Sequence, residues 1–259
     1  MEPTDKITPD WMRSAKTRGE RIAALTAYDY PTARLLDEAG VPVLLVGDSV
    51  GMVVLGYPDT TQVTLAEMRH HVAAVARAKT RALIVADLPY HTYQTAQNAV
   101  ANAHILMAAG AEAIKLEGGV AVLPEITALR EVGIAVMGHI GMLPQQVKEE
   151  GGYKIKGRSK NEKARLMADA IAVKEAGVFA LVLELVEPEL AREITARLAI
   201  PTIGIGSGPH CGGQIMVTPD LIGSFPWFRP KFAIAKADVA SMIRGAAAEF
   251  VRQVKEAGN

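Results

Sequence analysis

Polar and ionisable residues follow successive apolar segments of the 259-residue chain. They are Asp29, Asp48, Ser49, Asp87, Lys115, Glu117, His139, Glu184 and Ser207. A single Asp at such a position is usually a turn residue or a helix N-cap. Charges in solvated loops, however, would not keep one phase relative to a series of apolar segments. The repeated position therefore indicates a shared polar site.

Three of these residues, Asp48, Asp87 and Glu117, are carboxylates that can bind a metal ion. These oxygen ligands come without Cys or clustered His, which favours a hard cation such as Mg²⁺. Because Mg²⁺ usually completes its coordination with water and substrate oxygens, the pattern predicts a site that binds an oxyacid.

The other ionisable residues are candidates for proton transfer or charge stabilisation. Lys115 lies two residues before Glu117, so in a strand both side chains would project from one face; a structural ion pair is the alternative. Glu184 interrupts the apolar run LVLELV and is a candidate general base, with a salt bridge at the strand end as the alternative. A lone His139 would more often be a structural histidine, but its place in the series favours an active-site role.

The apolar segments themselves predict strands. These cover residues 22–26, 43–46, 83–86, 113–116, 135–138, 180–183, 202–205 and 214–217. Most are continuous apolar runs, which is typical of parallel strands covered on both faces. Between them the spacing becomes helical, as in the stripe Leu65, Met68, Val72 and Val75, and the segment 64–67 matches a capping box.

This alternation over about 250 residues predicts an α/β fold, a (β/α)₈ TIM barrel. We expect a single domain over residues 1–259, with residues 1–20 as an N-terminal extension. A doubly wound sheet is the alternative, but it would have a Gly-rich turn after the first strand, where this chain reads AYDYP.

Composition argues against several classes of protein. Lys and Arg number 28, as do Asp and Glu, so the chain lacks the basic excess of a nucleic-acid binder. Hydrophobic residues make up 49% of the chain, which argues against disorder. The single cysteine, the absence of a signal-like apolar core at the N-terminus and the lack of a long apolar run lead us to expect a cytoplasmic protein with no membrane association.

The motifs around these residues resemble those of the ketopantoate hydroxymethyltransferase family. They occur in the family's order and are TAYDYPTARLLDEAG (26–40), LLVGDSVGMVVLGYPDTTQVTLAEM (44–68), ADLPYHTY (86–93), IKLEGG (114–119), GHIGMLPQ (138–145), GGYKIKGR (151–158) and LVLELV (181–186). The resemblance implies a TIM-barrel enzyme that transfers a hydroxymethyl group from 5,10-methylenetetrahydrofolate to 3-methyl-2-oxobutanoate through a Mg²⁺-stabilised enolate. The product, 2-dehydropantoate, feeds pantothenate and coenzyme A biosynthesis.

The resemblance also assigns roles to residues at matching positions. It assigns Mg²⁺ binding to Asp48, Asp87 and Glu117, substrate binding to Asp48, Ser49, Asp87 and Lys115, and catalysis to Glu184, Lys115 and His139, with Glu184 as the proton acceptor. The implied partners are a small 2-oxo acid and the folate, and family members commonly form homo-oligomers, often decamers.

The late part of the chain departs from the family pattern. Gly212 in CGGQ stands where the family usually has Asp, and Pro219 stands where it tends to have His, which puts the folate-binding loops in question. One alternative is a Mg²⁺-dependent C–C lyase of the phosphoenolpyruvate mutase/isocitrate lyase type. Such lyases generally need a reactive Cys after a middle strand, whereas Cys211 lies later. A non-catalytic barrel scaffold is the other alternative, although the retained acids argue against it.

Overall fold

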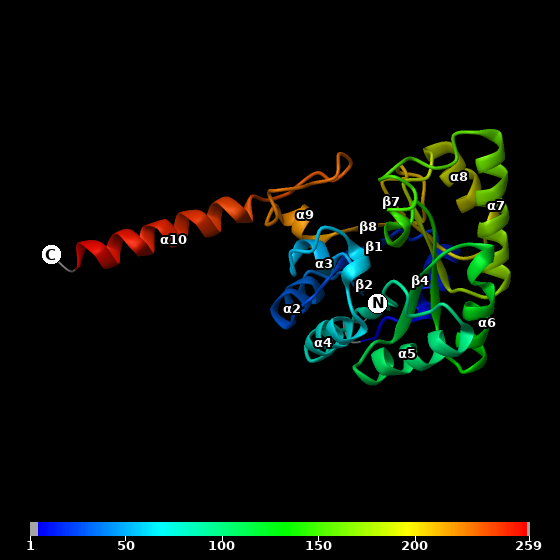
Figure 1. Ribbon diagram of the computed structural model, residues 1–259, viewed down its shortest axis with the longest axis horizontal. Coiled ribbons are helices and arrows are strands. Elements are labelled where there is room, and N and C mark those ends of the chain that lie inside the picture. The colour runs from blue at the N-terminus through cyan, green and yellow to red at the C-terminus, as the bar shows by residue number, and fades with distance from the viewer. Residues whose placement is uncertain (1–4, 258–259) are drawn as a thin grey trace. The chain divides into compact units, whose positions relative to one another are not determined.

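The computed structural model describes residues 5–257 of the chain, and within them eight parallel strands close into one barrel (Figure 1). Neighbouring strands follow chain order, from β1 beside β2 to β7 beside β8. The strands are β1 (Ile22–Thr26), β2 (Val43–Val46), β3 (Leu83–Asp87), β4 (Ala113–Glu117), β5 (Val136–Gly141), β6 (Ala180–Glu184), β7 (Thr202–Ile205) and β8 (Gly213–Met216). The prediction of a (β/α)₈ barrel is confirmed.

Several strands continue beyond the apolar runs that predicted them. β3 includes Asp87, β4 includes Glu117, β5 continues through His139 to Gly141 and β6 includes Glu184. The neighbouring strand supplies partners for these residues, with Asp87 opposite Lys115, Glu117 opposite His139 and Gly141 opposite Glu184. The polar side chains therefore lie on rigid strands and not on the loops that follow.

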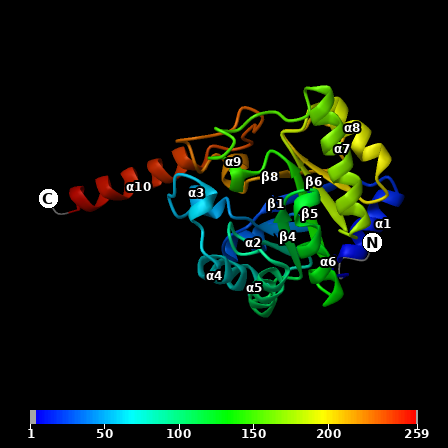
Figure 2. The same cartoon turned by 45° about the vertical axis from the view of Figure 1, so that its right-hand side comes forward.

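Helices connect the strands, and α2 and α4 to α8 lie outside the barrel (Figure 2). The α-helices are α1 (Pro9–Thr17), α2 (Tyr30–Glu38), α3 (Val50–Val53), α4 (Leu65–Ala76), α5 (Ala96–Ala108), α6 (Leu123–Glu131), α7 (Lys160–Glu175), α8 (Pro188–Arg197), α9 (Thr218–Ile222) and α10 (Val239–Glu256), and three 3₁₀ turns are η1 (Thr60–Gln62), η2 (Val120–Val122) and η3 (Pro144–Gln146). The predicted capping box is present, since Thr64 and Glu67 each accept a hydrogen bond from the other's backbone N–H at the start of α4.

The core has two apolar layers because successive strand residues point to opposite sides of the sheet. Leu44, Ile84 and Ile114 face outward and pack with the helices, while Val43, Val85 and their equivalents fill the barrel. The helix α1 adds the fully buried Met12 and the buried Ala15 to the inner layer, and burial of such a Met side chain stabilises by about 1.5–3 kcal/mol. Part of the predicted N-terminal extension thus belongs to the core, and residues 1–4 lie outside the described residues.

The chain forms two compact units, Met1–Ile215 and Met216–Asn259. The strand pattern did not predict this division, and the single domain over residues 1–259 stays a prediction. In the second unit α9 ends at Gly223, whose φ of +65° favours glycine, and Asp238 caps α10 by accepting a hydrogen bond from Ser241 N. No helix within residues 5–257 combines the length and hydropathy that crossing a membrane requires.

Candidate active site

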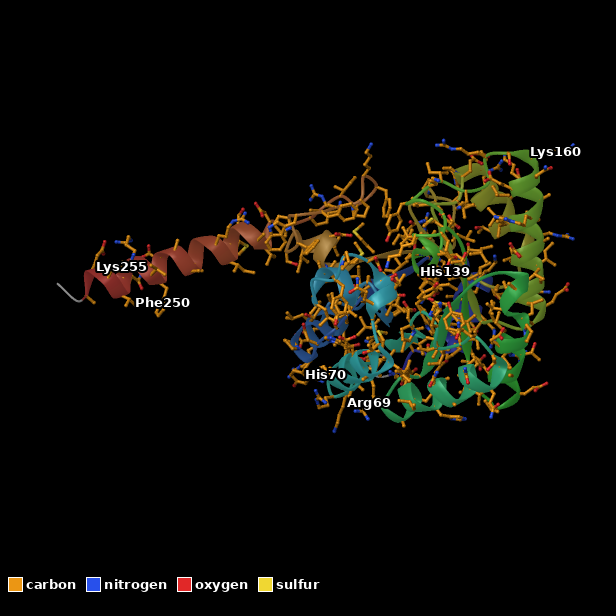
Figure 3. All side chains as sticks on the ribbon, in the orientation of Figure 1. Arg69, His70, His139, Lys160, Phe250 and Lys255 are labelled. Atoms are coloured by element: carbon orange, nitrogen blue, oxygen red, sulfur yellow. The ribbon has the colours of Figure 1, made fainter. Side chains whose placement is uncertain are left out.

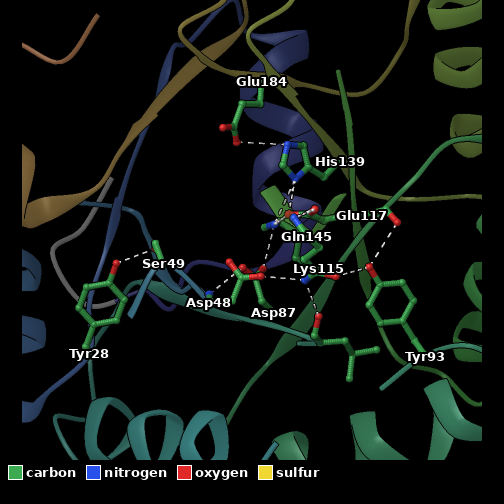
Figure 4. Close-up of polar contacts among 11 residues, drawn as sticks. Tyr28, Asp48, Ser49, Asp87, Tyr93, Lys115, Glu117, His139, Gln145 and Glu184 are labelled. Carbon is green, nitrogen blue, oxygen red and sulfur yellow. Dashed lines mark hydrogen bonds and ion pairs between the residues drawn. The ribbon is translucent and has the colours of Figure 1, made fainter. Parts of the chain in front are cut away.

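The interior of the barrel changes from apolar to ionisable towards the carboxyl ends of the strands. Asp87 continues the inward phase of Leu83 and Val85 on β3, and Lys115 and Glu117 continue that of Ala113 on β4. By the same alternation His139 follows Met137 on β5, and Glu184 follows Val182 on β6. Figure 4 shows these side chains meeting in one cluster. The apolar layer below excludes water from one side of the cluster.

Lys115 is the central cation of this cluster. Its Nζ lies 3.0 Å from Asp87 Oδ1, 3.8 Å from Glu117 Oε1 and 3.3 Å from His139 Nδ1. Burial disfavours its charge, but the carboxylates of Asp87, Glu117 and Asp48 outweigh burial and raise the pKa of Lys115 above its ordinary value. Lys115 is therefore an ammonium group throughout the neutral pH range.

His139 lies between two carboxylates. Its Nδ1 is 3.2 Å from Glu117 Oε1, and its Nε2 is 3.4 Å from Glu184 Oε2. Burial and the Lys115 charge lower the pKa of His139, but Glu117 and Glu184 together outweigh them and raise it to about 9. A charged imidazolium at neutral pH therefore orients Glu184, whose side chain is 12% exposed at the edge of the cluster.

Three carboxyl groups, those of Asp48, Asp87 and Glu117, surround Lys115. The backbone N–H of Asp48 donates to Asp87 Oδ2 at 3.1 Å. Burial, followed by repulsion from Asp87 and Glu117, raises the pKa of Asp48 well above its usual range, and burial raises the pKa of Asp87 although Lys115 opposes the shift. Burial would raise the pKa of Glu117 as well, but His139, Lys115 and the Gln145 N–H outweigh burial and lower it. Burial thus disfavours the charged forms of Asp48 and Asp87, and a further cation nearby would favour them.

Gln145 also belongs to this cluster, although its sequence context did not predict a role in the site. It lies in η3, directly after β5, and is 2% exposed. Its Nε2 donates to Asp48 Oδ2 at 2.8 Å and to Leu88 O at 3.0 Å, while its backbone N–H donates to Glu117 Oε2 at 3.1 Å. Tyr93 OH donates to Gln145 Oε1. Gln145 ends the motif GHIGMLPQ, and Tyr93 ends the motif ADLPYHTY. Because both side chains are uncharged, neither was selected as a candidate for metal binding or proton transfer.

Three other residues of the predicted series have local roles. Ser49 is half-buried, and its Oγ lies 2.8 Å from Tyr28 OH. Asp29 is exposed and caps α2 by accepting a hydrogen bond from Thr32 N. Ser207 is buried and supports the backbone around Glu184. Of these three residues, Ser49 is therefore the one whose side chain lies near the cluster.

The backbone beside Glu184 is tightly constrained. Ser207 Oγ accepts a hydrogen bond from Val186 N at 2.9 Å and donates one to Leu183 O at 2.7 Å. Leu185 has a φ of +47°, which is unusual for a residue with a side chain. Gly141 on β5 has a φ of +106°, and a Cβ there would collide with Glu184 O. Gly141 on β5 and Ser207, two residues after the end of β7, thus constrain the backbone around Glu184.

The cluster has a donor set for a hard cation, without a closed metal cage. Among residues 5–257, no three Asp, Glu, His or Cys side chains are arranged to hold a metal ion. Asp87 Oδ1 and Glu117 Oε1 are buried and have no hydrogen bond of good geometry within the described chain, although Lys115 and His139 lie near them. This arrangement fits Mg²⁺, which commonly takes one or two carboxylates and completes its shell with water and substrate.

The Gly212 departure lies at the opposite end of the barrel. Gly212 O accepts a hydrogen bond from Ile22 N at the start of β1, and Gly213 begins the parallel strand β8. Because the site occupies the carboxyl ends of the strands, this substitution leaves its residues untouched. Pro219 lies in the second unit, at the start of α9.

Comparison with known proteins identifies the family of the chain. Residues 6–258 match the family model described as ketopantoate hydroxymethyltransferase. The chain belongs to this family. The resemblance of the motifs is therefore confirmed over nearly the whole length of the chain.

Curated proteins of the ketopantoate hydroxymethyltransferase family are close in sequence. A 3-methyl-2-oxobutanoate hydroxymethyltransferase of Moorella thermoacetica is 50% identical over 99% of this chain and 96% of its own length. The protein of the same name from Caldivirga maquilingensis is 53% identical over 97% of this chain and 94% of its own. The sequence similarity to these relatives therefore extends over the entire barrel.

Solved structures with the same fold are much more distant in sequence. Phosphonopyruvate hydrolase in complex with oxalate and Mg²⁺ superposes with a TM-score of 0.65 at 15% identity, over 97% of this chain and 88% of the other. A 2,3-dimethylmalate lyase of the phosphoenolpyruvate mutase/isocitrate lyase superfamily gives 0.62 at 19% identity, with the same coverage. At these identities the likeness concerns the fold alone.

Proposed function

We propose that the protein transfers a hydroxymethyl group from 5,10-methylenetetrahydrofolate to 3-methyl-2-oxobutanoate and so forms 2-dehydropantoate. Family membership supports this reaction. The observation that carries it is the continuous series of ion pairs from Glu184 through His139 and Glu117 to Lys115 and Asp87 at the barrel mouth. Glu184, the proposed base, lies at one end of this series, and Asp87, a proposed metal ligand, lies at the other.

Mg²⁺ would be held by Asp48 and Asp87, whose raised pKa values indicate a need for positive charge. Glu117 stays a predicted third ligand, because Lys115, His139 and Gln145 already contact its carboxylate. When bound, the ion would act as a Lewis acid that stabilises negative charge on the substrate oxygens. The Mg²⁺ and oxalate of the distant phosphonopyruvate hydrolase support this chemistry, since oxalate also presents adjacent oxygens.

The residues of the chain then have distinct tasks. Lys115 and Ser49 would hold the oxygens of the 2-oxo acid, with the ammonium offsetting the charge that develops on them. Glu184 would accept the proton from C3, and the His139 imidazolium orients the Glu184 carboxylate. The C3 electron pair forms a bond to the methylene carbon of the folate, and water supplies the hydroxyl oxygen. Both bonds from that carbon to the folate nitrogens break, and the C3 proton and the second proton of the water end on the two nitrogens, which releases tetrahydrofolate.

The environment of Cys211 does not favour a phosphoenolpyruvate mutase/isocitrate lyase type of reaction. Such lyases generally need a reactive Cys, but Cys211 is 3% exposed and lies between β7 and β8, just before the amino end of β8. Burial raises the pKa of its thiol, so little thiolate forms at neutral pH.

Product analysis tests the proposed reaction. Purified protein, Mg²⁺, 3-methyl-2-oxobutanoate and 5,10-methylenetetrahydrofolate should give 2-dehydropantoate, detected by mass spectrometry, and a chelator should abolish its formation. A matched reaction with isocitrate and 2,3-dimethylmalate should give no cleavage. Cleavage of either acid without transfer to the 2-oxo acid would favour the lyase, and inactivity towards all of them would favour the scaffold.

An exposed apolar stripe on α10 supports the proposal of a homo-oligomer. Met242, Ile243, Phe250, Val251 and Val254 are each at least 50% exposed, and the spacing of Ile243, Phe250 and Val254 places these three on one face of the helix. Phe250 and Lys255 project from different sides of α10 (Figure 3). Replacing Phe250 and Val254 with Glu should lower the mass measured by light scattering. An unchanged mass would show that these residues of α10 do not form the subunit interface. The decamer, the cytoplasmic location and the absence of nucleic-acid partners stay predictions.

A further inference from the structure

A pocket of about 280 Å³ opens beside the cluster, among the loops after β3, β4 and β5. Its lining includes Tyr90, His91 and Tyr93 from the loop after β3, and Glu125 from the first turn of α6. The rings of Tyr90 and His91 are stacked, with centroids 3.7 Å apart. Aromatic rings of this kind pack well against a flat ligand ring.

The pocket shares a wall with the proposed active site. Glu117 and Gln145 line it, and both also contact the cluster, through His139 Nδ1 at 3.2 Å and Asp48 Oδ2 at 2.8 Å. A ligand seated in the pocket would therefore present one end to the reacting groups. Its volume is near the lower limit for ligand sites, so it suits a ring system and not a whole folate.

Glu125 is a buried carboxylate that the proposed mechanism does not use. It is 8% exposed, and its Oε2 has no hydrogen-bond partner within residues 5–257. A buried polar atom without a partner is costly and calls for an explanation. The first turn of α6 favours negative charge electrostatically, so the carboxylate is suited to receive N–H donors from a ligand.

We infer that this pocket binds the pterin ring of the folate co-substrate, with Glu125 as the acceptor. The inference rests on the proposed function. A reduced pterin is flat over its pyrimidine half and carries an amino group beside a ring N–H, two donors that match the two oxygens of a carboxylate. Tyr90 and Tyr93 supply the aromatic lining, and the one-carbon end of the ring system points towards Glu117 and Gln145.

The test separates folate binding from chemistry on the 2-oxo acid. Glu125→Gln should weaken tetrahydrofolate binding, measured anaerobically by calorimetry, by at least about 10-fold, because hydrogen bonds to a charged acceptor are lost. Its folate-independent exchange of the C3 hydrogen of 3-methyl-2-oxobutanoate in D₂O should stay within about twofold of the parent. Glu131→Gln, an exposed change on the same helix, is the matched control and should leave both measurements unchanged.

A second variant covers the case in which Glu125→Gln fails to fold. Ala121→Phe fills the pocket from its exposed rim and should also weaken tetrahydrofolate binding while exchange continues. Parent-like tetrahydrofolate affinity in either folded variant would overturn the inference, as would an equal loss of exchange and binding. If the parent protein itself exchanges no C3 hydrogen, the proposed function fails and not only the pocket.

Discussion

The buried ion pair between Lys115 and Asp87 permits a quantitative test of the electrostatic account. The two groups are 3.0 Å apart, and their side chains are 5% and 3% exposed. Removing one partner of such a pair leaves a buried charge and costs about 3–5 kcal/mol. Lys115→Met should therefore lower the free energy of unfolding by this amount, since it leaves three neighbouring carboxylates without their ammonium.

A double-mutant cycle isolates the pair from its surroundings. Asp87→Asn keeps an acceptor for the Asp48 N–H and leaves Lys115 with Glu117 at 3.8 Å. The double variant Lys115→Met, Asp87→Asn should lose less stability than the sum of the single changes, with a coupling of about 2–3 kcal/mol. The assay is urea unfolding at pH 7.5 with a chelator, because bound metal would stabilise the folded state by mass action.

An exposed pair provides the control for this cycle. Arg192 Nη2 lies 2.7 Å from Glu189 Oε2 on α8, but both side chains are more than half exposed. The coupling there should be below about 0.5 kcal/mol. A coupling free energy below about 0.5 kcal/mol for Lys115 and Asp87 would refute the conclusion that burial strengthens the interaction between these two side chains.

Three further outcomes follow from the structure. Ser207→Ala leaves the Val186 N–H without its acceptor and should destabilise the protein by about 1–3 kcal/mol. It should lower kcat while KM changes less, and Ser207→Thr should restore part of kcat. Equal losses in kcat and in substrate affinity would contradict a role of Ser207 in positioning Glu184. Burial, opposed by Arg229, raises the pKa of Asp220 from 3.8 to about 6, so the folded state holds this proton more tightly and loses stability as pH rises from about 4 to 7. Asp220→Asn should therefore raise the thermal midpoint at pH 7.5 and have little effect at pH 4, with an upper bound of about 3 kcal/mol; a lower midpoint at pH 7.5 would contradict this. Gly141→Ala should reduce C3 exchange at least about 10-fold in protein that still folds, because the added Cβ meets Glu184 O; parent-like exchange would show that the position of Glu184 tolerates the shift.

The sequence predicts the barrel well because parallel strands covered on both faces leave continuous apolar runs. The ends of β3, β4, β5 and β6 were predicted too early. Asp87, Glu117 and Glu184 interrupt the hydropathy pattern, yet their backbones remain paired with the next strand. Hydropathy reports where a side chain is apolar, whereas strand length depends on backbone pairing.

The charged residues of the candidate site and Ser49 were predicted from the sequence, whereas the neutral residues Gln145 and Tyr93 were missed. Gln145 reaches Asp48 across 97 residues of sequence, and no local pattern encodes that contact. The prediction also included Asp29, which the structure shows as a helix cap, because strand-end residues of both kinds look alike before the direction of each side chain is known. Glu125 on α6 lay outside the strand-end series altogether.

Hydrogen exchange at C3 of 3-methyl-2-oxobutanoate tests the central claim most directly. In D₂O with Mg²⁺ and without folate, the parent protein should exchange this hydrogen, and Glu184→Gln should reduce the rate at least about 100-fold, the usual contribution of a general base. Calorimetry should show that the variant still binds the 2-oxo acid in the presence of Mg²⁺, and Glu189→Gln on the exposed face of α8 should exchange like the parent. Exchange at the parent's rate in Glu184→Gln would contradict the assignment of the base.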